Sequence, residues 1–106
     1  MALTPEVKVK RVVVAQLKEL KAYYFYPVTG GYGASGVPDI VGSFGGKFFG
    51  IECKAGNNRP TPLQLKNLLQ IQASGGIAAV VNEENMHNIQ QILKGEVLWT
   101  PPKSQS

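Results

Sequence analysis

The sequence predicts one α/β domain in which helices cover a mixed β-sheet. Two segments with helical periodicity each open on Thr-Pro, and several apolar, strand-like segments lie between them. A further apolar segment follows the second helix, and strands on both sides of a helix are typical of this class. At 106 residues we expect a single domain over residues 1–106, with a disordered tail at 101–106.

The first helix is expected from Thr4 to about residue 21. Thr4 supplies a capping hydroxyl, and Pro5 suits the first helical position. Apolar residues then recur at helical spacing and form one stripe, at Val9, Val13, Leu17 and Leu20. Glu6 shares this stripe, so its side chain is expected to point towards the sheet. A first-turn acid that stabilises the helix dipole is an equal alternative.

Three strands are expected next, at residues 23–28, 38–44 and 47–54. Residues 29–36 are glycine-rich and would either let the backbone approach a phosphate or serve as a flexible connector. The Gly-Gly pair at 45–46 predicts a two-residue hairpin turn.

The second helix is expected from Thr61 to about residue 74, where glycines end it. Residues 77–82 predict a fully apolar strand of the kind found at a sheet centre. A third helix at 85–94 and an edge strand at 96–100 complete the expected fold.

The positive charge is concentrated in the first two thirds of the chain. The net charge is +4, but residues 1–66 carry nine basic groups against four acids, and the remainder carries two against three. This asymmetry indicates an anionic partner, of which nucleic acid is the first candidate, although a merely solubilising surface is an equal alternative.

Cysteine content and hydropathy indicate where in the cell the protein is expected. The single cysteine excludes an intramolecular disulfide framework and a cysteine-rich zinc site. No apolar run reaches the roughly 18 residues of a membrane span, and no signal-peptide pattern opens the chain. We therefore expect a cytoplasmic protein without a membrane partner.

Two acids and a lysine form the most informative cluster. In the hairpin register set by the Gly-Gly turn, Asp39 lies opposite Glu52, and facing Cβ atoms are roughly 4.5–5.5 Å apart. Two such carboxylates repel each other unless a cation lies between them. Strand alternation puts Lys54 on the same face as Glu52 and turns Cys53 into the core. The simpler alternative is an exposed Glu52–Lys54 pair, with Asp39 as a turn residue.

These residues suit phosphodiester hydrolysis. A cation held by carboxylates supplies a Lewis acid and lowers the pKa of water, and a lysine beside it can orient that water. Gln64 shares a helical stripe with Leu68 and Ile71 and would face the same region. It also completes a capping box with Thr61, which accounts for it without any chemistry, and the two roles are compatible.

Three segments together resemble a known family: GVPDIVG at 36–42, FFGIECKAG at 48–56 and RPTPLQ at 59–64. They resemble the PD-(D/E)xK nucleases and, within them, the VRR-NUC (virus-type replication-repair nuclease) domain in its stand-alone phage or bacterial form. The resemblance spans residues 6 to about 82. It implies a restriction-endonuclease-like core, with a mixed central sheet flanked by helices in the order αβββαβ.

The resemblance also implies roles for single residues. Asp39, Glu52 and the main-chain carbonyl of Cys53 would bind Mg²⁺ or Mn²⁺, and Glu6 would reach the metal directly or through water. Lys54 would position or activate the attacking water, and Gln64 would support the site.

The implied activity is that of a metal-dependent DNA endonuclease selective for four-way (Holliday) junctions or other branched DNA in replication, recombination or repair. A homodimer is expected, with contacts from the aromatic first strand and Trp99. Six residues are expected to contact DNA: Lys8, Arg11, Tyr32, Ser35, Arg59 and Lys66. The alternatives are a non-catalytic DNA-binding module or a subunit of a larger nuclease complex.

Overall fold

The computed structural model describes residues 3–28 and 36–102, and its elements follow the expected order. The expected loop at 29–36, except for Gly36, and residues 103–106 of the expected tail lie outside these ranges. The elements are α1 (Pro5–Glu19), β1 (Tyr23–Phe25), β2 (Ile40–Phe44), β3 (Lys47–Cys53), α2 (Pro62–Ala73), β4 (Ile77–Val81) and α3 (Ile89–Leu93).

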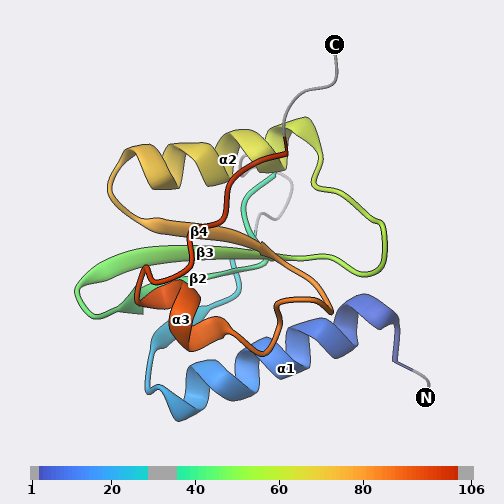
Figure 1. Cartoon of the computed structure of the whole chain (residues 1–106), viewed down its shortest axis with the longest axis horizontal. Helices are drawn as coiled ribbons and strands as arrows, with labels where there is room; N and C mark the ends of the chain where they lie inside the picture. Colours follow the sequence, from blue (N-terminus) through green and yellow to red (C-terminus); the bar gives the residue numbers. More distant parts are fainter. Residues whose placement is uncertain (1–2, 29–35, 103–106) are drawn as a thin grey trace.

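The four strands form one mixed sheet in the order β1-β2-β3-β4. The first three strands are antiparallel neighbours, and β4 runs parallel to β3 because α2 carries the chain back between them. One face of the sheet is covered by α2 and the other by α1 and α3 (Figure 1). The predicted mixed α/β architecture is confirmed.

The β2–β3 hairpin has the predicted register. Phe44 pairs with Lys47 and Ile40 pairs with Ile51. Gly45 and Gly46 both have positive φ, at 59° and 82°, as a tight two-residue hairpin turn requires. Extended by one residue, this register places Asp39, which directly precedes β2, opposite Glu52 near the end of β3.

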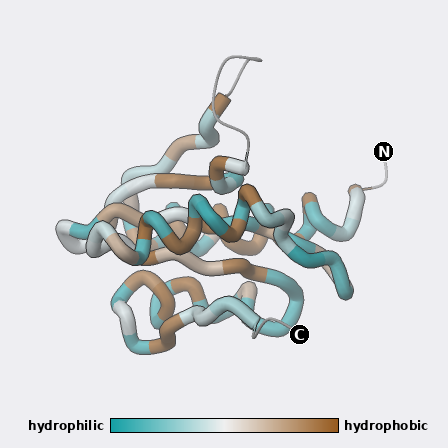
Figure 2. Tube along the Cα trace, turned by 90° about the horizontal axis from the view of Figure 1, so that it is seen from above, coloured by the Kyte–Doolittle hydropathy of each residue, from teal (hydrophilic) through white to brown (hydrophobic). Residues whose placement is uncertain are grey.

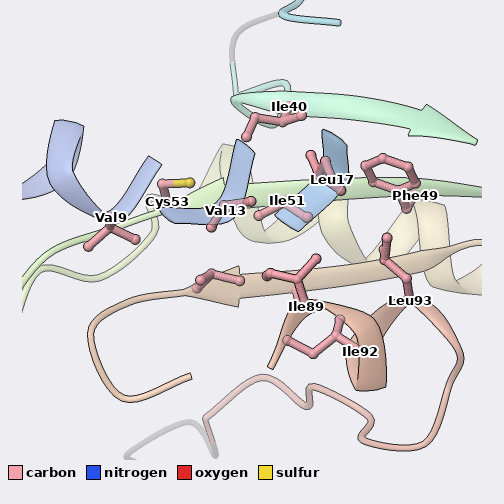
Figure 3. Close-up of a cluster of buried hydrophobic side chains, with 12 residues drawn as sticks. Val9, Val13, Leu17, Ile40, Phe49, Ile51, Cys53, Ile89, Ile92 and Leu93 are labelled. Carbon is pink, nitrogen blue, oxygen red and sulfur yellow. The ribbon is translucent and has the colours of Figure 1, made fainter. Parts of the chain in front are cut away.

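The main core lies between the sheet and the α1–α3 layer. Thr4 accepts a hydrogen bond from the Val7 N–H at the start of α1, and the predicted apolar stripe is buried at Val9, Val13 and Leu17. Figure 3 shows these side chains meeting residues from β2, β3 and α3. The buried residues of this core are Val9, Val13, Leu17, Ile40, Phe49, Ile51, Cys53, Ala79, Val81, Ile89, Ile92 and Leu93.

The opposite face is covered by α2, whose capping box is formed as expected. The Thr61 hydroxyl accepts from the Gln64 N–H, and the Gln64 side chain accepts from the Thr61 N–H. Seen from this side, α2 has both hydrophilic and hydrophobic residues along its length (Figure 2), as a helix with one buried face requires. No helix in the described parts of the chain is long and apolar enough to cross a membrane.

Four expectations about the strands and the last helix are corrected. β4 lies at an edge of the sheet, and it is apolar because helices α2 and α3 pack against it. β1 ends at Phe25, and the proline at 27 could not donate to a ladder. Residues 85–88 are not part of α3, because Asn82 and Asn85 form a side-chain-stabilised turn there. Residues 96–100 form no strand in the structure as described.

Gly42 is a strict packing constraint within the sheet. A Cβ at this position would lie 1.9 Å from the Tyr23 carbonyl oxygen and 2.8 Å from the Phe49 ring. We therefore predict that Gly42→Ala lowers the free energy of unfolding by about 2 kcal/mol or more, because β1 must move away from β2. Urea unfolding measures this change. Ser43→Ala is the control at an exposed neighbouring position, and equal effects of the two substitutions would contradict the prediction.

Candidate metal and catalytic site

Three carboxylates from three separate segments meet where β3 ends. Glu6 comes from the first turn of α1, Asp39 precedes β2, and Glu52 lies in β3. Each contributes an oxygen, and these oxygens all lie within 4.8 Å of one another. Helices α1 and α2 both begin on this side of the molecule (Figure 1), so two positive helix N-termini lie towards the cluster.

Glu52 is the buried member of the cluster, with only 2% of its surface exposed. Its Oε2 atom accepts a hydrogen bond from the Gln64 side-chain amide at 3.0 Å and lies 3.5 Å from the Lys54 ammonium. Its Oε1 atom is buried and has no hydrogen-bond partner among the described residues. Burial, and then the nearby Asp39 charge, raise the pKa of Glu52 from 4.5 to about 7.

Asp39 is held towards β3 by the main chain. Its Oδ2 atom accepts a hydrogen bond of 2.9 Å from the Cys53 N–H. The side chain of Cys53 points the opposite way, into the core, as strand alternation predicted. Burial raises the pKa of this thiol to about 12, so Cys53 packs as a small apolar residue.

Gln64 has both of the roles that its sequence pattern allowed, helix capping and contact with the carboxylate cluster. Its Oε1 atom accepts from the Thr61 N–H at 2.8 Å, and its Nε2 atom donates to Glu52 at 3.0 Å. The same amide therefore caps α2 and fixes the orientation of a buried carboxylate. A glutamate at this position would keep the cap and lose the donor.

Glu6 joins the cluster without being buried. The sequence predicted that Glu6 points inward with the apolar stripe of α1. Its carboxylate does reach the cluster, but the residue as a whole is exposed. Val9, one turn further along α1, is fully buried. Glu6 therefore lies at the rim of the sheet, where a long side chain reaches the other two acids.

These residues fit a hard divalent cation. Three carboxylates and one ammonium group carry a net charge of about −2 when ionised, and oxygen ligands favour Mg²⁺ or Mn²⁺. The Glu52 Oε1 atom is buried and has no hydrogen-bond partner among the described residues. A cation bound to this atom would stabilise the buried negative charge.

The residues expected to contact DNA come from separate elements of the fold. Lys8, Arg11, Arg59 and Lys66 are all exposed, whereas Tyr32 and Ser35 lie outside the described residues. Lys8 and Arg11 lie on α1, Arg59 lies in the loop before α2, and Lys66 lies on α2.

One contact beside the site had no signal in the sequence. The Glu83 carboxylate accepts from the Gly56 N–H at 3.0 and 3.3 Å and so ties down the loop that follows Lys54. Residue 83 reaches this loop because β4 runs parallel to β3, with Val81 beside Cys53. Only that parallel register, which the sequence does not reveal, would have identified it.

The raised pKa of Glu52 predicts a specific pH dependence of stability. The folded state binds this proton more tightly than the unfolded chain, so the stabilisation is complete below pH 4.5 and is lost as the pH rises through about 7. In EDTA we expect wild type to lose about 3 kcal/mol relative to Glu52→Gln between pH 4 and pH 8.

Urea unfolding of both proteins across this range measures the difference. Excess Mg²⁺ at pH 8 is expected to stabilise wild type and to leave Glu52→Gln nearly unchanged. Parallel pH profiles of the two proteins would contradict the assignment of a buried, proton-binding Glu52.

Comparison with known proteins places this geometry in context. No protein-family model matches the sequence. The chain is 29% identical over 90 residues to "Putative nuclease p44" of Acyrthosiphon pisum secondary endosymbiont phage 1, covering 84% of this chain and 95% of that protein.

Two solved structures are also similar. A VRR_NUC domain protein superposes with a TM-score of 0.63 at 24% identity, covering 89% of this chain and 92% of that one. The Holliday junction resolvase Hjc of Archaeoglobus fulgidus gives a TM-score of 0.46 at 22% identity, over 69% of this chain and 65% of that one. The chain therefore has the fold of a VRR-NUC domain, and the resemblance inferred from its three motifs is confirmed.

Proposed function

We propose that the protein is a metal-dependent DNA endonuclease that hydrolyses phosphodiester bonds at the carboxylate cluster. The observation that carries this proposal is the convergence of Glu6, Asp39 and Glu52 beside Lys54, with one buried Glu52 oxygen unpartnered among the described residues. The similarity to a phage protein named as a nuclease, over most of both chains, supports it.

Asp39, Glu52, Glu6 and the main-chain carbonyl of Cys53 would hold Mg²⁺ or Mn²⁺. Bound there, the cation supplies a Lewis acid for a phosphate oxygen and for the attacking water. The Cys53 N–H fixes one oxygen of Asp39, which leaves the other free to face the cluster. Gln64 does the same for Glu52, so two of the acids are oriented before any ligand arrives.

Lys54 has the reach and the charge to act on the water. Its ammonium lies 3.5 Å from Glu52, on the same face of β3 and at the edge of the buried region. From there it can donate to the attacking water and offset negative charge that develops on the phosphate. The Glu83 contact to Gly56 restrains the loop directly after Lys54 and so limits where this lysine can lie.

We further propose a homodimer that cuts four-way junctions or other branched DNA. β1 lies at the edge of the described sheet, with Tyr23 70% exposed and Phe25 also exposed. Its outer side has no strand partner among the described residues, so an apolar edge is available for a two-fold contact. Tyr24 and Trp99, expected in the same contact, pack instead against the core and contribute little. A two-fold axis would present two identical sites to a branched substrate.

The first prediction from this function concerns the cluster itself. Asp39→Asn keeps an acceptor for the Cys53 N–H but removes the charge, and Glu52→Gln keeps the side-chain shape. Each is expected to lower Mg²⁺-dependent cleavage by about 100-fold or more while DNA binding is retained. Glu84→Gln, an exposed acid in the loop after β4, is the control.

Lys54→Ala is expected to lower turnover without changing the Mg²⁺ concentration needed for half-maximal activity. Gel assays with labelled single strands, duplexes and four-way junctions, in Mg²⁺ or Mn²⁺, measure all four variants. Full activity of either carboxylate variant would refute the proposed site, and tight binding without metal-dependent cutting would favour a non-catalytic DNA-binding module.

Gln64 separates capping from site support. Gln64→Glu keeps the cap of α2 but places a fourth carboxylate against Glu52, so we expect a melting temperature within a few degrees of wild type and strongly impaired cleavage. Unchanged cleavage would reduce Gln64 to its structural role. Thermal unfolding and the cleavage assay together decide between the two.

The substrate and the assembly are tested separately. Light scattering at micromolar concentration is expected to give twice the 11.4 kDa of one chain, and Tyr23→Lys is expected to shift the mass towards the monomer. A four-way junction is expected to be cut faster than a linear duplex of equal length. Equal rates would contradict junction selectivity without affecting the proposed chemistry.

A further inference from the structure

A hollow beside α1 is not part of the carboxylate cluster. It has a volume of about 400 Å³ and lies between α1 and the residue that follows β1. We call it the α1 groove. Its lining residues are Val7, Lys10, Arg11, Val14, Ala15, Lys18 and Tyr26.

The α1 groove uses a second face of the helix. The core stripe of α1 is Val9, Val13 and Leu17, whereas the groove takes positions 7, 10, 11, 14, 15 and 18, which recur at the same helical spacing. Three of these are cations, and none of the described lining residues is an acid. The face is therefore basic and partly apolar, and neither property is needed to pack the helix on the sheet.

Tyr26 gives the groove an aromatic wall and holds one cation in place. The Lys10 ammonium lies 4.9 Å from the centre of the Tyr26 ring, a cation–π contact. The ring also meets Tyr24 edge-on at 6.1 Å, and the side chain remains exposed. The lysine is therefore positioned at the groove in the absence of any ligand.

The chemistry of the lining selects among anionic partners. A duplex presents phosphates on its outside and keeps its bases stacked within, so it would use the cations and leave the apolar hollow empty. A single strand exposes bases as well as phosphates, and grooves that combine cations with aromatic residues bind it. The volume is also within the range of pockets that take small molecules, which suits a base and its sugar.

The groove also begins at the proposed active site. Val7 directly follows Glu6, and from Val7 to Lys18 the helix extends about 16 Å at 1.5 Å per residue. A strand leaving the carboxylate cluster along α1 would meet the three cations in turn.

We propose that the α1 groove binds an unpaired, single-stranded segment of a branched DNA substrate, such as the free strand of a flap, next to the bond that is cut. A base packs against Val7, Val14 and Tyr26, and the flanking phosphates pair with Lys10, Arg11 and Lys18. The placement next to the cut bond rests on the proposed nuclease function, whereas the binding itself does not.

Binding is measured in EDTA, where no cleavage occurs, by fluorescence anisotropy of a labelled 12-nucleotide oligothymidine and of a 12-base-pair duplex. The test variant is Lys10→Ser with Lys18→Ser. Its matched control is Lys47→Ser with Lys94→Ser, which removes two exposed lysines from the hairpin turn and from the end of α3. Thermal unfolding confirms that each variant is folded.

The test variant is expected to bind the oligothymidine about 10-fold more weakly, with a salt slope reduced by about 1.4, whereas the control changes by less than about twofold. Tyr26→Phe is expected to bind like wild type, and Tyr26→Ser about fivefold more weakly. Asp39→Asn is expected to bind the oligothymidine like wild type. Loss of cleavage and loss of binding in the α1 groove are therefore separate results.

Three outcomes would overturn the proposal. One is an equal loss of binding in the test and control variants, which would mean that only net charge matters. Another is an equal loss for the duplex and the single strand. The third is displacement of the oligothymidine by a 12-residue polyglutamate at similar concentration, which would assign the groove to acidic protein segments.

Discussion

The burial of the Glu52 carboxylate is the constraint on which the rest of the site depends. A carboxylate in apolar surroundings is costly, and this one has a raised pKa because burial and Asp39 both disfavour its charge. Lys54 and Gln64 satisfy one of its oxygens, while the other has no partner among the described residues. A buried carboxylate of this kind lowers stability, and in the proposed function it does so because a metal site needs a charge that folding alone would avoid.

The topology of the sheet brings the necessary groups to that carboxylate. The tight β2–β3 turn sets the register that places Asp39 opposite Glu52, and the crossover through α2 returns Gln64 above the end of β3. Because β4 is parallel to β3, the loop after β4 comes beside the loop after Lys54, and Glu83 can hold it. The flanking helices both start at this end, so the site lies at the junction of all three layers.

In the proposed function a cluster of three acids has to bind next to a polyanion, so the charges around the cluster matter. The two helix N-termini offset the acids locally, and a divalent cation would do the same in the proposed function. Further out, the α1 groove offers three cations, Lys10, Arg11 and Lys18, the first of which lies four residues after Glu6. The proposed division of roles, with acids at the centre for a metal and cations further out for phosphates, agrees with the excess of basic residues in the first two thirds of the chain.

What the sequence determined by itself was local or followed from local rules. Helix starts at Thr4 and Thr61, the Gly-Gly hairpin and its register, and hence Asp39 opposite Glu52, depend on neighbouring residues and could be predicted. Non-local packing decided the rest: the short β1, the edge position of β4, the contact from Glu83 and the basic groove beside Tyr26. Gln64 takes part in both kinds of interaction. Its capping box can be predicted from four neighbouring residues, whereas its hydrogen bond to Glu52 forms only because α2 packs on the sheet. Local hydrogen bonds and hydrophobic periodicity depend on short segments and can be predicted from them. The contacts between faces and loops depend on how distant segments pack into one core.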